Sequence, residues 1–246
     1  MRTPGEGKTP TRWKSTPRIP FVLGGTRFRR NERTFQVGKT FNAMIRTMIR
    51  NVTYERIQCL GHNLGIVSSG LGSFWRLASR IMLEESMGTT GPDGLVQFES
   101  EAWYPLAGHL RMLERIRKDF GEVALRQVGA SIPRFARAMP AGIDVRAAFQ
   151  RLDVMYHLNH AVNGQPMFSE HTGQLQDGIG HYLARPFARH KQILCDCTGP
   201  YPCAFDEGLL LAFARSHEPS AMLTHLEPGM CRTRGAARCT YSVAWT

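Results

Sequence analysis

The sequence lacks the features that would place it in several large protein classes. It has no apolar run near the ~18 residues of a membrane-spanning helix, and its early apolar run, IPFVL, is too short for a secretory signal. It also has no G-x-S-x-G, P-loop, Rossmann glycine or H-E-x-x-H pattern. We therefore expect a cytoplasmic protein without a membrane span, and no catalytic motif marks it as an enzyme.

Acidic residues are scarce at the start of the chain. Residues 1–39 hold ten Lys or Arg and two Glu, a net charge of +8 out of +11 for the whole chain. This stretch is rich in Pro, Thr and Gly and buries too little apolar surface to offset its chain entropy, so we predict a disordered basic arm. Its Lys and Arg side chains could bind the phosphates of a nucleic acid. Because the sequence has no recognisable nucleic-acid-binding module, the favoured interpretation is a leader segment that binds no partner.

Residues 40–246 are predicted to form a single ligand-binding domain with two halves. Apolar residues at helical spacing dominate residues 40–163, with helices expected over 40–85, 103–121, 122–140 (interrupted by Pro133) and 144–164. From residue 164 the pattern changes to short strand-like segments, a helix that begins near Cys203 and a final hairpin around RTRG. This order predicts an α+β fold, in which N-terminal helices pack on a small antiparallel sheet and one helix precedes a C-terminal hairpin.

Cysteine is rare, with six in 246 residues, but five of the six lie between residues 195 and 239. A cytoplasmic location keeps thiols reduced, which disfavours disulfides. Cys231 and Cys239 lie on the two legs of the predicted hairpin, and Cys203 lies at a helix N-terminus, which favours a thiolate. Together the three could bind a metal ion, or they could be buried apolar thiols. Cys195 and Cys197 are assigned to packing.

The predicted helix at 144–164 carries Asp153, His157 and His160 on one flank, at positions i, i+4 and i+7. This spacing suits metal binding or proton transfer. A solvated helix face is the alternative interpretation.

Two C-terminal segments resemble a known family. GPYPCAFDEGLLLAF (199–213) and HLEPGMCRTRGAARCTYSVAW (225–245) resemble the 4-vinyl reductase domain, also described as a hydrocarbon-binding domain, and residues 103–133 resemble its helical half. The same superfamily takes in haem nitric-oxide-binding domains. The resemblance implies an apolar pocket for a hydrophobic small molecule, in a sensory or carrier module that is often a homodimer.

The resemblance also implies particular site residues. Some members hold a zinc ion with three cysteines and an acid, which here correspond to Cys203, Cys231 and Cys239, with Glu227 as the candidate acid because Pro228 stands at the family's position. We expect no haem, because the sequence has no Tyr-x-Ser-x-Arg motif. An enzyme of the same fold acting on a hydrophobic molecule, or a structural dimerisation module, are the alternatives. The candidate pocket residues are Trp103, Tyr104, Leu106, Met155, Tyr156, Phe168 and Tyr182.

Overall fold

The computed structural model describes residues 54–134 and 142–246. They all belong to one compact unit, Met44–Thr246. The predicted basic arm and the helical stretch expected before residue 54 lie outside the described residues. Within the described ranges, no helix is both long and apolar enough to cross a membrane.

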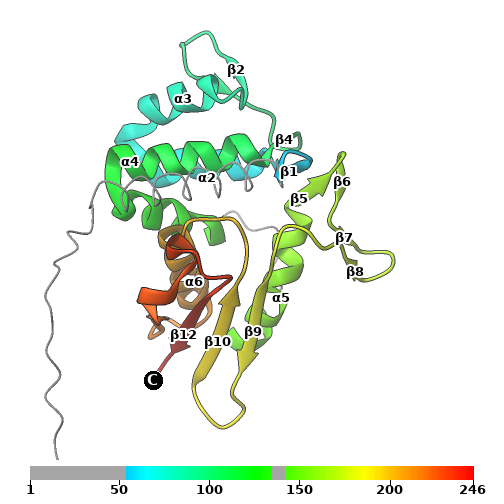
Figure 1. Ribbon diagram of the computed structural model, residues 1–246, viewed down its shortest axis with the longest axis vertical. Coiled ribbons are helices and arrows are strands. Elements are labelled where there is room, and N and C mark those ends of the chain that lie inside the picture. The colour runs from blue at the N-terminus through cyan, green and yellow to red at the C-terminus, as the bar shows by residue number, and fades with distance from the viewer. Residues whose placement is uncertain (1–53, 135–141) are drawn as a thin grey trace, which may run out of the picture. The chain divides into compact units, whose positions relative to one another are not determined.

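The α+β prediction is confirmed, because helices combine with two four-stranded sheets whose pairings are antiparallel (Figure 1). The first sheet has the order β4-β1-β5-β6 and the second β11-β12-β10-β9. The helices are α2 (His62–Leu71), α3 (Trp75–Glu84), α4 (Leu106–Ser131), α5 (Val145–Leu158) and α6 (Cys203–His217). The strands are β1 (Ile57–Leu60), β2 (Thr89–Thr90), β3 (Val96–Gln97), β4 (Trp103–Pro105), β5 (His160–Val162), β6 (Gln165–Pro166), β7 (Phe168–Ser169), β8 (Gln174–Leu175), β9 (Tyr182–Pro186), β10 (Gln192–Cys197), β11 (Met222–Leu226) and β12 (Cys239–Ala244).

The first sheet differs from the prediction, which had placed its strands β1 and β5 within helices. Cys59 of β1 lies opposite Tyr104 of β4 on one side and His160 of β5 on the other. Helix α5 accordingly ends at Leu158 rather than near residue 164. Strand pairing over such sequence distances is a tertiary effect that overrides the local helical pattern.

Helix α5 begins where the sequence predicted. The Asp144 carboxylate accepts hydrogen bonds from the backbone N–H groups of Arg146 and Ala147, at 2.7 and 2.9 Å, and so caps two otherwise unpaired donors. Helices α5 and α6 pack against strands of the second sheet. The fully buried Ile193, Tyr241 and Val243 of that sheet form part of the core.

Helices α4 and α6 approach each other closely because glycines lie at their contact. A Cβ atom added at Gly129 would lie 2.0 Å from the Phe205 carbonyl oxygen, and one added at Gly208 would lie 2.0 Å from the Arg126 carbonyl oxygen. Helix α4 is broken at Gly121, whose φ of 81° is left-handed, at the position where the sequence predicted a helix stop. The segment after this break is therefore the one held against α6.

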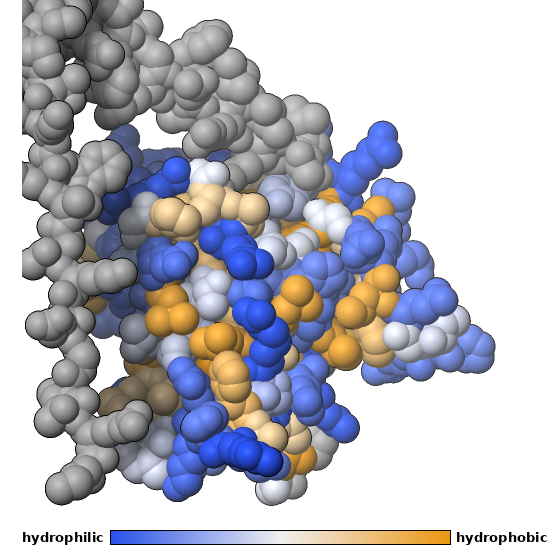
Figure 2. Space-filling model, turned by 60° about the horizontal axis from the view of Figure 1, so that its bottom comes forward, coloured by the Kyte–Doolittle hydropathy of each residue, from blue (hydrophilic) through white to orange (hydrophobic). Residues whose placement is uncertain are grey.

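The C-terminal hairpin is confirmed as β11 paired with β12. The loop between the strands contains the 3-10 turns Pro228–Met230 and Arg232–Arg234, and Gly235, whose φ is 95°, follows the second turn. Cys231 lies in this loop, not on a strand of the hairpin as predicted, whereas Cys239 begins β12. Large exposed apolar side chains include Leu183, Met222 and Met230. Figure 2 shows hydrophobic residues interspersed with hydrophilic ones on the face that it presents. Scattered apolar side chains are usual on protein surfaces, so this face does not identify a binding partner. The homodimer therefore stays a prediction.

Candidate functional site

A cavity of about 70 Å³ lies between helices α2, α4, α5 and α6. Its walls are apolar or aromatic on most sides, with Val67 from α2, Leu152 from α5 and Leu209 and Phe213 from α6. No side chain with a full charge is among the described residues that line it. Its polar lining residues are Asn63, His109, Asn159, His160 and the tyrosines Tyr156, Tyr182 and Tyr201.

The tyrosine hydroxyl groups at the cavity are bonded to the protein. The Tyr156 hydroxyl donates to the Ile179 carbonyl oxygen at 3.0 Å, and the Tyr182 hydroxyl donates to the Asp206 carboxylate. Each hydroxyl therefore has its donor engaged outside the cavity. These side chains present mainly their ring faces to a ligand.

The third hydroxyl is held by a histidine. His160 Nδ1 lies 2.7 Å from the Tyr156 carbonyl oxygen, so this nitrogen carries the hydrogen and donates it. His160 Nε2 then accepts from the Tyr201 hydroxyl, at 2.7 Å. Burial lowers the pKa of His160 to about 3, which keeps the imidazole neutral and this bond intact at neutral pH.

His109 on α4 also faces the cavity and is only 2% exposed. Burial lowers the pKa of His109 to about 4, so it too is neutral at neutral pH. Its Nδ1 lies 3.7 Å from the Cys59 sulfur, and burial raises the pKa of that thiol to about 12. The cavity thus offers a neutral imidazole within apolar surroundings.

The structure places three of the seven predicted pocket residues at this cavity: Met155, Tyr156 and Tyr182. The other four lie elsewhere. Trp103 and Tyr104 belong to β4 and pair with β1, Leu106 is fully buried in the core, and Phe168 pairs with Leu175 in β7 and β8. The prediction missed His109, although it lies three residues after Leu106 and four before Leu113, on the apolar stripe of the helix.

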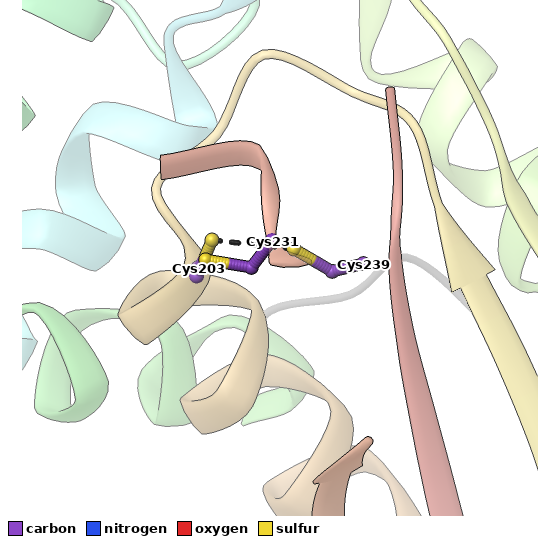
Figure 3. Close-up of side chains that lie close together, drawn as sticks. All are labelled: Cys203, Cys231 and Cys239. Carbon is purple, nitrogen blue, oxygen red and sulfur yellow. Dashed lines mark hydrogen bonds between the residues drawn. The ribbon is translucent and has the colours of Figure 1, made fainter. Parts of the chain in front are cut away.

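Three cysteines from distant parts of the chain meet beside α6. Cys203 is the first residue of α6, Cys231 precedes the Arg232–Arg234 turn and Cys239 begins β12. One sulfur from each lies within 4.8 Å of the other two, and all three residues are buried. Figure 3 shows these side chains grouped together. The structure therefore brings together the cysteines that the sequence singled out.

Hydrogen bonds keep one of these thiols ionised. Cys203 Sγ and Cys239 Sγ are 3.3 Å apart, and the Arg232 backbone N–H donates to Cys239 Sγ at 3.3 Å. The Cys203 bond and then the Arg232 donors lower the pKa of Cys239 to about 6, while the same bond raises the pKa of Cys203. At neutral pH the pair is therefore a Cys203 thiol that donates to a Cys239 thiolate.

The predicted fourth ligand, Glu227, does not join the three sulfurs. It is exposed, its φ is 53°, and it lies directly before a 3-10 turn in which no residue is buried. His225, the other candidate, has Nδ1 3.3 Å from Glu207 Oε1 and its ring lies against Tyr241. Among the described residues, no carboxylate or imidazole completes this group.

A second group of donors forms beside α5, with one change from the predicted set. Asp153, His157 and His181 each place one donor atom within 4.8 Å of the other two. His160 is not part of it, because α5 ends at Leu158 and His160 belongs to β5. A strand residue no longer follows the helical i, i+7 relation, so the sequence pattern failed at that position.

Comparisons with known proteins identify the fold. No family model and no curated protein matches this sequence. An H-NOX protein from S. oneidensis in the Fe(II) ligation state matches with a TM-score of 0.52 and 13% identity, over 76% of this chain and 96% of that one. The same comparison finds a S. oneidensis H-NOX protein in the Fe(II)NO state, with a TM-score of 0.52, 12% identity and coverage of 76% and 99%. A doubly substituted Tt H-NOX has a TM-score of 0.51, 14% identity and coverage of 76% and 95%.

These similarities show that the chain shares the H-NOX fold. They agree with the α+β fold expected from the sequence, but they do not single out the 4-vinyl reductase domain. They contradict the expectation of no haem, because the matching structures are H-NOX proteins in the Fe(II) and Fe(II)NO ligation states. That expectation rested on one missing motif, and a motif can diverge while the fold persists. The comparisons give no support to zinc.

Proposed function

We propose that this protein is a small-molecule-binding module, of a sensory or carrier kind, whose ligand occupies the cavity between α2, α4, α5 and α6. One observation carries the proposal. The described lining has no charged side chain, and its tyrosine hydroxyl groups are bonded to protein partners. An ionic ligand would lose its hydration there without gaining a counter-charge, so the ligand is an uncharged, largely apolar molecule.

The size of the cavity limits this ligand. A cavity of about 70 Å³ is smaller than the ~150 Å³ that holds benzene in an engineered protein cavity. A molecule of that size or larger requires the walls to separate. The resemblance of residues 199–213 and 225–245 to the hydrocarbon-binding type of domain supports the same ligand class.

Native mass spectrometry of the purified protein tests this proposal, with toluene added as a probe where no molecule is carried through purification. We expect a bound organic mass that is lost when Leu209→Trp fills the cavity. Leu211→Trp, on the same helix but away from the cavity lining, is the matched control and keeps the ligand. Equal binding by both variants would contradict the proposal. An empty homodimer in every spectrum would favour the structural dimerisation module.

Haem is a second candidate ligand, supported by the fold and by His109. The described residues meet one requirement, because a buried neutral imidazole, His109, lines the cavity and could be a ligand to haem iron. They do not meet two further requirements. The cavity volume of about 70 Å³ is smaller than a haem macrocycle, and the described lining residues include no cation that could pair with the haem propionates.

Absorption spectroscopy during a haemin titration tests this second candidate. Binding through His109 predicts a Soret band that shifts or disappears in His109→Ala. The band stays unchanged in His171→Ala, whose exposed side chain lies away from the cavity. A spectrum that is identical in wild type and His109→Ala would exclude His109 as the axial ligand.

We also propose that Cys203, Cys231 and Cys239 bind a thiophilic metal ion. Three buried sulfurs within 4.8 Å of one another, one of them already a thiolate, match the soft donors that such ions select. The ion would join the start of α6 to the C-terminal hairpin. Metal analysis of purified protein is expected to show the same metal content per chain in wild type and in Cys195→Ser, and a lower content in Cys203→Ser and Cys239→Ser. Equal metal content in all four proteins would contradict this assignment.

A further inference from the structure

We propose a second metal site, on the flank of α5, in which Asp153, His157 and His181 bind a divalent transition-metal ion. One donor atom from each residue lies within 4.8 Å of the other two. None of the three lines the ligand cavity, and none belongs to the cysteine group. The site is therefore separate from the ligand cavity and from the cysteine group.

Two structural elements hold the donors in place. Asp153 and His157 lie one turn apart on α5, and His181 directly precedes β9. Asp153 Oδ1 accepts from the Tyr182 backbone N–H at 2.9 Å, and Asp153 Oδ2 lies 2.9 Å from His181 Nδ1. The carboxylate is thus fixed between the helix and the strand before any ion binds.

His157 provides the observation that points to a ligand. Its side chain is fully buried, and its Nδ1 lies 2.8 Å from the Asp153 carbonyl oxygen, so Nδ1 carries the hydrogen and donates it. Its Nε2 is buried and has no hydrogen-bond partner within the described part of the chain. An unpartnered buried nitrogen costs about 1–3 kcal/mol. Metal-ligating histidines often donate one ring N–H to a carbonyl group and bind the ion through the other nitrogen. In His157 the nitrogen beside the carboxylate is Nδ1, 3.6 Å from Asp153 Oδ1, so Nε2, which has no partner among the described residues, must turn toward that carboxylate to share an ion with it.

The site is open to solvent on one side. The His181 side chain is 26% exposed, and Asp177, whose Oδ1 lies 3.3 Å from His181 Nε2, is 94% exposed. An ion can therefore arrive past Asp177, which offers a further carboxylate oxygen. Two imidazoles with one or two carboxylates suit cobalt, nickel or zinc better than calcium or magnesium, which prefer oxygen ligands alone.

A bound ion would also stiffen one wall of the ligand cavity. Tyr156 and Tyr182 line the cavity and are the immediate sequence neighbours of His157 and His181. Their rings are in contact, with centroids 5.0 Å apart. A metal ion that joins α5 to β9 would hold these two rings at a fixed separation.

Titration of the purified full chain with cobalt(II) chloride tests the site, because the absorption spectrum reports which atoms bind the ion. Nitrogen and oxygen ligands give weak visible d–d bands, whereas thiolates add strong near-ultraviolet charge-transfer bands. We expect the nitrogen and oxygen d–d bands in wild type, beside any thiolate bands from the cysteine group, and a loss of affinity of about 10-fold or more for the ion that gives the d–d bands in His181→Gln and Asp153→Asn. His171→Gln, which alters an exposed histidine outside the group, is the control.

His181→Gln decides the outcome, because the fully buried His157 is needed for folding as well. The proposal is overturned if wild type and His181→Gln bind cobalt equally tightly with the same d–d bands. It is also overturned if cobalt binds with thiolate bands alone.

Discussion

The cavity and the cysteine group are both buried and both include residues of α6. They differ in the protonation state of their titratable groups, which are neutral in the cavity and partly charged in the cysteine group. In the cavity, burial lowers the pKa of His109 to about 4 and that of His160 to about 3, so both imidazoles are neutral. In the cysteine group, the pKa of Cys239 falls to about 6, which favours the charged form, and Arg232 forms an ion pair with Asp206.

The difference lies in the donors that surround each group. Burial alone favours the neutral form of a titratable group, whereas hydrogen-bond donors and opposite charges can outweigh burial. Cys239 receives hydrogen bonds from Cys203 and from the Arg232 backbone, but the cavity has no cation or carboxylate among its described lining residues. The cavity therefore suits an uncharged molecule, and the cysteine group suits a cation.

The largest effect is expected from breaking the buried ion pair. Arg232→Leu leaves the fully buried Asp206 carboxylate without its counter-charge, which should lower the free energy of unfolding by about 3–5 kcal/mol. Urea unfolding measures the loss. Arg238→Leu, whose side chain is 63% exposed, is the control and should change stability by less than about 0.5 kcal/mol. Equal losses would show that the charged region does not depend on this pair.

The next effect concerns α6, which the two regions share. Gly208→Ala or Gly129→Ala places a Cβ atom against the backbone of the opposing helix, so α4 and α6 must separate, at a cost of about 1–3 kcal/mol. Gly229→Ala is the control, because its Cβ would meet nothing within 4 Å. Thermal unfolding of the three variants compares them. A tolerated Gly208→Ala would mean that the close approach of the helices is not required.

Acidification should lower the free energy of unfolding, because the buried histidines at the cavity are neutral in the folded protein. The pKa of His109 is lowered from 6.5 to about 4, so below pH 6.5 the unfolded chain binds a proton that the folded chain does not. Stability then falls with falling pH by about 1.4 kcal/mol per pH unit for this residue until pH 4. We expect His109→Gln to flatten the dependence of unfolding free energy on pH by that amount between pH 6 and pH 5. An unchanged slope would show that His109 protonates freely in the folded protein.

The smallest effect is expected at an exposed ion pair of the second sheet. Arg185 Nη2 lies 2.8 Å from Asp196 Oδ2, but the Arg185 side chain is 59% exposed and the Thr240 hydroxyl also donates to Asp196. Arg185→Ala should therefore cost only about 0.2–1 kcal/mol in urea unfolding. A loss as large as that of Arg232→Leu would show that solvent exposure does not determine how much each ion pair contributes to stability.

Local patterns predicted the elements that depend on neighbouring residues. The Asp144 cap, the start of α6 at Cys203 and the C-terminal hairpin were all visible in short stretches of sequence. Strand β1 and the end of α5 were not, because β1 pairs with strands more than 40 residues further along the chain. No window of neighbouring residues reports such a pairing.

The residues of the candidate site were also predicted only in part. Cys203, Cys231 and Cys239 do lie together, although Cys231 is in the hairpin loop and not on a strand as predicted. Glu227 was placed with them by proximity in sequence, which does not report the direction of a side chain. His109 was missed because a histidine on an apolar helical stripe looks like an ordinary core residue, and His181 was missed as a partner of Asp153 because they are 28 residues apart.

Helix α6 contributes residues to both regions. It begins at Cys203, and its Phe205, Leu209 and Phe213 line the cavity. An ion that displaces Cys203 must therefore move the cavity wall as well, so occupancy of either place would change the affinity of the other. Thermodynamic linkage makes the two changes equal: the factor by which metal alters ligand affinity is the factor by which ligand alters metal affinity.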